Sequence, residues 1–305
     1  MFAGQDTNCR LCPRKCGVDR KSGALGYCQA GQEIELFRYG PHHGEEPPIT
    51  GSNGSGTIFF SRCTMSCVYC QNYPWSKEGK GQICSTSELA AIFKALHDQG
   101  CHNWNLVSPT PWLPLIEKAL ITTRSQGCSL PVVYNTSGFE RLQTIKALDG
   151  IANIYLTDLR YSLDKTATGA SCANDYVKYA RKSFRQMWHQ VGPLDCDNHG
   201  VARRGVICRI LILPNHHTQA IDNLHWLADN FGTDVSVSLM SQYTPAYRAS
   251  SLPAWNRSLT KVEYHEVLNV FNDIGFSTGW VQDFGGHTDD NLIGYQMETQ
   301  SAPKL

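Results

Sequence analysis

The sequence of 305 residues predicts an α/β fold with a parallel sheet and a small Cys-rich segment before it. From Thr57 onward, short apolar runs alternate with amphipathic stretches, which is the pattern of β/α units with right-handed crossovers. Hydrophobic residues make up 41% of the chain, and the glycines bring the apolar class to roughly half, as in globular proteins with a core. The alternation leaves two architectures open, a doubly wound sheet and a barrel.

A boundary is expected near residue 50. Gly and Pro residues, which interrupt regular structure, are concentrated in residues 39–48 and 51–56. We therefore predict a Cys-rich segment with its linker over residues 1–50. Residues 51–305 then form one large domain with a C-terminal extension, a size that α/β barrels reach as a single unit.

Six short apolar runs predict the strands of the sheet. They cover residues 57–61, 103–108, 132–136, 154–158, 206–213 and 235–240. Apolar runs of about 4 to 8 residues between turn signals are typical of parallel strands buried on both faces.

The amphipathic stretches between these runs predict the helices. One helix follows the capping box Ser85 to Glu88 and ends at Gly100. Another begins at the capping box at Thr260 and ends near Gly275. The remaining helices are expected near residues 113–126, 140–148, 174–190 and 219–231.

Polar residues lie at the ends of most of the predicted strands or just beyond them. Ligands of parallel α/β sheets bind beyond the carboxyl ends of the strands, so these residues are candidates for a binding site. They are Ser108, Asn135, Asp158, Arg160 and Gln242. Each alone is also compatible with a turn or a salt bridge. Arg209 lies inside an apolar run, where an unpaired guanidinium is costly and needs an anion.

Four cysteines fall within 20 residues near the N-terminus: Cys9, Cys12, Cys16 and Cys28. The glycines between them let the chain fold back tightly, so that four thiolates can meet at one centre. Four sulfurs suit either tetrahedral zinc or an iron-sulfur cluster. Two disulfides are the structural alternative.

The charge balance and the first residues of the chain bear on which partners and which compartment we expect. The chain has 27 Lys and Arg against 27 Asp and Glu, without the basic excess of a nucleic-acid-binding protein. The first residues lack the charged and apolar regions of a signal peptide, and no apolar run is long enough to span a bilayer. We therefore expect a cytoplasmic protein without a nucleic-acid or membrane partner, whose clustered cysteines bind metal.

A second group of cysteines has three members, Cys63, Cys67 and Cys70. Their spacing is Cys-x3-Cys-x2-Cys. A 4Fe-4S cluster held by three thiolates leaves one iron open, whereas electron-transfer clusters usually have every iron bound by protein. Open coordination is typical of catalysis. The alternative is a chance grouping of buried thiols.

This second group resembles the signature of the radical S-adenosylmethionine (SAM) enzymes, which also have an aromatic residue, here Tyr69, before the last cysteine. The resemblance implies a partial (β/α)6 TIM-like barrel and SAM chelated by the open iron of a 4Fe-4S cluster. One electron from the cluster would cleave SAM to methionine and a 5'-deoxyadenosyl radical, which abstracts hydrogen from the substrate.

Over nearly its whole length the chain resembles the PflX-type relatives of pyruvate formate-lyase activating enzyme. The matching stretches are residues 9–18, 44–47, 54–61, 67–72, 134–138, 154–158 and 239–243. In activating enzymes an Asp-x-Lys after the fourth strand holds the cofactor, which implies that role for Asp158 and Arg160. An Arg near the start of the fifth strand also contacts SAM there, which implies that role for Arg209, and the carboxylate of SAM is one candidate for its anion. Tyr69, Ser108, Asn135 and Gln242 complete the expected cofactor-binding set.

The chain departs from this pattern at two places. Ser108-Pro109-Thr110-Pro111 replaces the usual Gly-Gly-Glu-Pro that binds the amino group of SAM. Ile210 follows Arg209, where PflX-type relatives commonly have His.

The resemblance implies that a protein or peptide is the substrate and that an external one-electron donor such as flavodoxin or ferredoxin supplies the electron. Two alternatives remain open. The same chemistry can act on a small metabolite, or the chain can be a non-catalytic iron-sulfur or zinc-binding module. The module explains the four N-terminal cysteines but gives no purpose to a site with three ligands.

Overall fold

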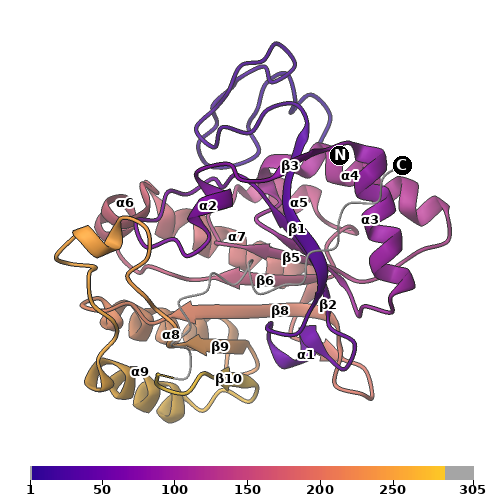
Figure 1. The fold of residues 1–305 in the computed structure, drawn as a ribbon. Coiled ribbons are helices and arrows are strands. Elements are labelled where there is room, and N and C mark those ends of the chain that lie inside the picture. The colour runs from indigo at the N-terminus through magenta and orange to yellow at the C-terminus, as the bar shows by residue number, and fades with distance from the viewer. Residues whose placement is uncertain (1, 286–305) are drawn as a thin grey trace.

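The computed structural model describes residues 2–285 and has a mixed α/β fold around one largely parallel sheet (Figure 1). Across this sheet the strands run in the order β10-β9-β8-β6-β5-β4-β2-β1-β3, with β7 (Asp195–Cys196) paired to β8. The parallel strands are β2 (Ser55–Phe60), β4 (Trp104–Val107), β5 (Val132–Thr136), β6 (Ile154–Asp158), β8 (Ala202–Leu211), β9 (Ser236–Met240) and β10 (Gly279–Val281).

The order of the parallel strands decides between the two expected architectures. From β2 to β10 each strand lies beside the next parallel strand in the chain. A doubly wound sheet would reverse this order in its middle. The fold is therefore the predicted partial (β/α)6 TIM-like barrel, and β10 extends it by one strand that the sequence did not indicate.

Helices connect the parallel strands and cover the outside of the sheet. They are α3 (Thr86–Asp98), α4 (Leu113–Ser125), α5 (Leu142–Ala147), α6 (Asp164–Ser171), α7 (Tyr176–Val191), α8 (His217–Phe231) and α9 (Lys261–Ile274). Both predicted capping boxes are confirmed, with Ser85 accepting from the Glu88 amide and Thr260 from the Glu263 amide. The helix α6 was not predicted; neither were the short helices α1 (Pro47–Thr50) and α2 (Tyr73–Ser76) or the 3-10 turns at residues 110–112 and 249–251.

Residues 39–42, which we expected in a linker, belong to a strand instead. They end β1 (Ile34–His42), which pairs antiparallel with β2 and, through residues 34–36 only, with β3 (Gln82–Cys84). Pro41 is tolerated in this strand because, at that position, β1 has no neighbouring strand among the described residues on the side away from β2. The pairing of His42 with Ser55 places the end of β1 at the amino end of the barrel.

Side chains alternate along the strands between the helix-covered face and the inside of the barrel. On one face, Tyr134, Tyr155 and Val206 belong to the large core beneath the helices. On the other, Val133, Leu156 and Ile207 form a small cluster with Ile49 of α1. Asn135, Asp158 and Arg209 lie two residues beyond these three, so they share the inner face, toward the carboxyl ends of their strands.

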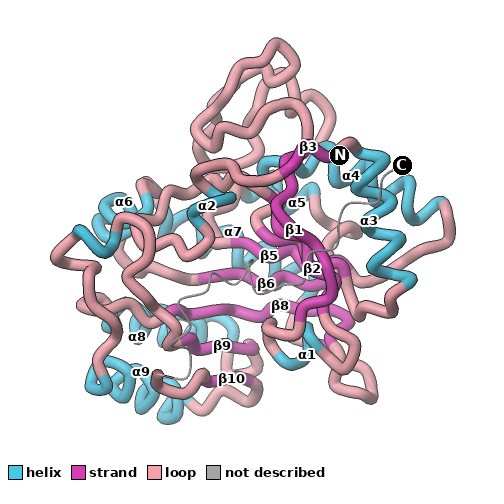
Figure 2. Tube along the Cα trace, in the orientation of Figure 1, coloured by secondary structure: helices cyan, strands magenta, loops and turns pink. Residues whose placement is uncertain are grey.

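The Cys-rich segment before β1 folds without helices or strands, as the loops at the top of Figure 2 show. Within residues 2–285, none of the helices combines the length and apolarity that a membrane crossing requires. The expected C-terminal extension lies in part outside the described residues.

Candidate functional site

The loop with Cys63, Cys67 and Cys70 follows β2 at the carboxyl end of the barrel, between that strand and α2. Cys67 is buried, and its Sγ accepts hydrogen bonds from Ser171 Oγ at 3.0 Å and Arg160 Nη1 at 3.1 Å. Cys70 Sγ lies 3.2 Å from Ser76 Oγ. Cys67 thus receives two hydrogen bonds from the barrel, and Ser76 lies within hydrogen-bond distance of Cys70.

The three sulfurs are near enough to influence one another. Burial raises the pKa of the Cys70 thiol, and the charges of Cys67 and then Cys63 raise it further. A cation shared by the three sulfurs would remove this repulsion, because thiolates are the form that binds metal. None of the 13 cysteines, all of which fall within the described residues, forms a disulfide.

Asp158, at the end of β6, joins the two arginines that the sequence singled out. Its Oδ2 accepts from Arg160 Nε at 2.9 Å and Nη2 at 2.6 Å, and its Oδ1 accepts from Arg209 Nε at 2.8 Å. Burial alone would raise the pKa of Asp158, but Arg209 and Arg160 outweigh it, so the pKa is lowered. The carboxylate therefore stays charged.

Arg209 has protein partners, contrary to the expectation that its charge calls for an outside anion. Its guanidinium also donates to Asn135 Oδ1 at 2.6 Å and lies 3.6 Å from the Glu45 carboxylate. The side chain stays in an apolar strand because the barrel interior supplies these acceptors, which the sequence of the strand alone does not show.

Two neighbouring cavities open beside these residues. The smaller, of about 160 Å³, is lined by Cys70, Gln71, Asp158 and Arg160, among others. The larger, of about 360 Å³, extends toward the amino end of the barrel, where the loop after β1 lines it. The cavities share Asn72, Arg209, Met240 and Gln242.

Most of the expected cofactor-binding residues meet at these cavities. Tyr69, Asp158, Arg160, Arg209 and Gln242 line the smaller one, and Asn135 lines the larger one. Ser108 is not among the residues that line either, although its backbone is unusual, with a φ of 56°.

Tyr69 anchors the cysteine loop to the barrel. Its hydroxyl shares a short hydrogen bond with the hydroxyl of Tyr161, which in turn lies 2.5 Å from Ser171 Oγ. Its ring stacks on Trp255 with 5.3 Å between centroids. Because Ser171 also donates to Cys67, this chain of hydroxyls fixes the position of that sulfur.

Two residues of the larger cavity, Glu45 and Glu46, had no assigned role from the sequence. Glu46 is only 9% exposed, and Glu45 is half-buried beside Arg209. Their one sequence signal is the Gly-Glu-Glu-Pro motif at residues 44–47, which lies in a breaker-rich segment that reads as exposed loop.

The four N-terminal cysteines come together around one small cavity of about 10 Å³. The cavity is lined by Cys9, Cys12, Cys16 and Cys28. Arg20 Nη2 lies 3.2 Å from the sulfur of Cys9 and 3.8 Å from that of Cys28. Burial raises the pKa of Cys28, and Arg20 opposes that effect. All four cysteines thus line one cavity, and their binding of a common metal stays a prediction.

The Cys-rich segment packs directly on the three-cysteine loop. Arg14 Nε donates to the carbonyl of Thr64 at 3.1 Å, and Tyr27 Oη donates to Ser66 Oγ at 3.0 Å. Thr64 itself lines the cavity of the four cysteines. The two cysteine sites are therefore neighbours.

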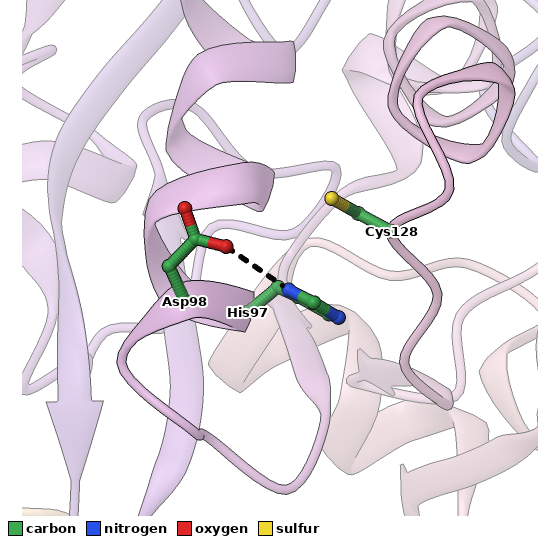
Figure 3. A group of neighbouring side chains, drawn as sticks. All are labelled: His97, Asp98 and Cys128. Carbon is green, nitrogen blue, oxygen red and sulfur yellow. Dashed lines mark hydrogen bonds and ion pairs between the residues drawn. The ribbon is translucent and has the colours of Figure 1, made fainter.

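A further group of ligand-type side chains, His97, Asp98 and Cys128, lies at the end of α3 (Figure 3). Asp98 is paired there with Lys94 Nζ at 2.5 Å and with His97 Nδ1 at 3.2 Å. The Asp98 carboxylate is thus explained as part of a surface ion pair at the helix end, without a metal ion.

Comparison with known proteins gives the following likenesses. No protein-family model matches the chain. Uncharacterized protein MJ0674 of Methanocaldococcus jannaschii is 28% identical over 274 residues, which cover 86% of this chain and 74% of that protein.

Two solved structures are similar at lower identity. The structure of anSMEcpe with bound AdoMet and Cp18Cys peptide has 13% identity and a TM-score of 0.48, covering 69% of this chain and 56% of that one. The FeFe-hydrogenase maturase HydG from Carboxydothermus hydrogenoformans has 15% identity and a TM-score of 0.47, covering 72% and 50%. This chain thus spans about half the length of those two structures.

Proposed function

We propose that the protein is a radical SAM enzyme that abstracts hydrogen from a protein or peptide substrate, in the manner of the activating enzymes and their PflX-type relatives. One observation carries the proposal: the three-cysteine loop adjoins a cavity into which Asp158, Arg160 and Arg209 bring fixed charges. A loop that only bound metal for structure would have no use for this cavity.

The residues present fit a 4Fe-4S cluster. Cys63, Cys67 and Cys70 provide three thiolates, and Arg160 and Ser171 donate to the sulfur of Cys67. Hydrogen bonds to ligand sulfurs tune such clusters and stabilise their charge. When bound, the cluster supplies the electron that cleaves SAM to methionine and a 5'-deoxyadenosyl radical.

The protein's own residues bind and orient SAM in this proposal. Arg160 offers its guanidinium beside Cys70 and Asp158, where it suits the methionyl carboxylate. Asp158 is held ionised by its two arginines, so its carboxylate suits the ribose hydroxyls of SAM, which would donate hydrogen bonds to it. Gln242, Asn135 and the ring of Tyr69 complete the walls, and Ser108 is left with a backbone role at the strand end.

The Cys-rich segment is proposed to hold a second 4Fe-4S cluster or zinc. The four cysteines that line one cavity offer the sulfur ligands that either centre uses. Contact with the three-cysteine loop makes this segment a suitable docking region for an external one-electron donor such as flavodoxin or ferredoxin. Thirteen cysteines without a disulfide suit a reducing compartment, and we place the protein in the cytoplasm.

Formation of 5'-deoxyadenosine tests the proposed chemistry. Anaerobically reconstituted protein with dithionite and SAM is expected to release this product, and Cys67→Ser is expected to release none, because the cluster loses one of its three ligands. Cys196→Ser is the matched control, since Cys196 is an exposed cysteine of β7, which pairs with the start of β8 at the amino end of the barrel. Equal product from wild type and Cys67→Ser would contradict the proposal.

A further inference from the structure

Two carboxylates, Glu45 and Glu46, enter the larger cavity from the amino end of the barrel. They lie in the loop after β1, and the pairing of His42 with Ser55 sets that loop at the start of β2. Both line the cavity of about 360 Å³. A carboxylate in such a place needs a compensating partner, because an unpaired charge is costly to bury.

Glu45 has such partners within the protein. Its Oε1 accepts from Asn105 Nδ2 at 3.0 Å, and its Oε2 lies 3.6 Å from Arg209 Nη1. Arg209 is shared, however, because it also donates to Asp158 and Asn135. Its single positive charge is thus already divided between two carboxylates.

Glu46 is the carboxylate that remains short of positive charge. It is 9% exposed, and although Ser238 hydrogen-bonds to its carboxylate, its Oε2 has no hydrogen-bond partner among the described residues. Burial raises the pKa of Glu46 against the effect of Arg209, and Glu45 raises it further. Three carboxylates (Glu45, Glu46 and Asp158) face two guanidiniums, those of Arg209 and Arg160, and Arg160 also donates to Cys67.

The rest of the larger cavity suits an aliphatic chain that ends in a cation. Phe59, Val107 and Trp280 give it apolar walls, and Met240 lies where it meets the smaller cavity. A chain whose charged end reached Glu46 would therefore extend past Arg209 toward the cavity beside Cys70.

We propose that the substrate carries a cationic nitrogen, either ammonium or guanidinium, and that Glu46, with Glu45 beside it, binds this group inside the barrel. The inference rests on the proposed function, which makes this cavity the substrate site. The cation can belong to a lysine or arginine side chain of a peptide or to a small alkyl amine, and the test separates these sources.

The test measures binding of defined probes to anaerobically reconstituted protein saturated with SAM. The cationic probes are n-butylguanidinium, n-butylammonium and the tripeptide Gly-Lys-Gly, and the neutral reference is n-butylurea, which matches n-butylguanidinium in shape. We expect the wild type to bind n-butylguanidinium at least about tenfold more tightly than n-butylurea. Tighter binding of the tripeptide than of n-butylammonium indicates a peptide source, and the reverse indicates a small amine.

The variants locate the site. Glu46→Gln keeps the shape but removes the charge, and we expect it to abolish the preference for the cation. Glu33→Gln, the same change at an exposed position, keeps the preference. Glu45→Gln is expected to lose less than Glu46→Gln, because Asn105 and Arg209 already hold Glu45. A wild type without the preference, or Glu46→Gln with all of it, overturns the inference.

Additional measurements cover a variant that fails to fold, a site that belongs to SAM, and failure of the proposed function itself. Circular dichroism checks that Glu46→Gln is folded; if it is not, the wild-type preference and its reduction in Glu45→Gln decide the matter. The same binding is measured without SAM, and cation binding that is present without SAM but lost when SAM is added would overturn the inference, because the site would then belong to the cofactor. Release of 5'-deoxyadenosine by the same wild-type samples without probe tests the proposed function separately, so each idea can fail alone.

Discussion

At the residue scale, the buried carboxyl of Glu140 gives a pH-dependent prediction. Glu140 is 1% exposed and accepts hydrogen bonds from the hydroxyls of Thr110 at 2.6 Å and Thr136 at 2.7 Å. Burial raises its pKa to about 7, although these hydrogen bonds oppose the rise. The fold therefore favours the protonated carboxyl.

The sign of the effect follows from the raised pKa. Stability from the protonated carboxyl is fully present below the ordinary Glu pKa and is lost as pH rises to about 7. Between about pH 5.5 and about pH 7.5, the wild-type free energy of unfolding should fall by about 2 kcal/mol more than that of Glu140→Gln. Anaerobic denaturant titrations of both proteins at both pH values measure this difference. If the free energy of unfolding changes equally with pH in the two proteins, the Glu140 carboxyl does not have the predicted effect.

At the scale of elements, the turn after β5 supports the end of β6. Gly138 has a φ of 79°, and a Cβ there would collide with the carbonyl oxygen of Asp158. Gly150 has a similar φ of 73° with open space around it. Comparing substitutions at these two glycines separates the cost of the steric contact from the cost of backbone strain.

We predict that Gly150→Ala costs about 1 kcal/mol of stability, from the left-handed backbone alone. Gly138→Ala should cost roughly 2 kcal/mol more, because the backbone at Asp158 must move. It should also weaken SAM binding, since Asp158 shifts with the strand end. Denaturant unfolding and equilibrium dialysis of SAM measure the two effects; equal losses in both variants would show that the contact with Asp158 has no energetic weight.

The elements that the sequence indicated were those with a strong apolar pattern. Predicted strands and helices matched because each buries a full face in the core. The strand β10 was missed because two of its three residues are exposed, and β1 because Gly40 and Pro41 read as breakers. Pairing with neighbouring strands of the sheet holds both strands in place, and the local sequence pattern does not show that pairing.

For the whole molecule, the site divides into a part that the sequence shows and a part that only the fold creates. Cysteine ligands were recognisable because metal chemistry restricts residue type and local spacing. The charge network was not, since Glu45, Asn135, Asp158 and Arg209 come from different elements and meet only across the barrel. Burial of Glu46 depends in the same way on strands that follow it in the chain.

In our proposal Cys63, Cys67 and Cys70 hold a cluster whose open iron binds SAM beside Asp158 and Arg160. Electron paramagnetic resonance of the reduced, reconstituted protein tests it most directly, with and without SAM labelled with nitrogen-15 at its amino group. To isolate this cluster, the protein carries Ser at Cys9, Cys12, Cys16 and Cys28. We expect SAM to change the cluster signal and the labelled nitrogen to couple to it. A cluster signal that SAM leaves unchanged would contradict the proposal.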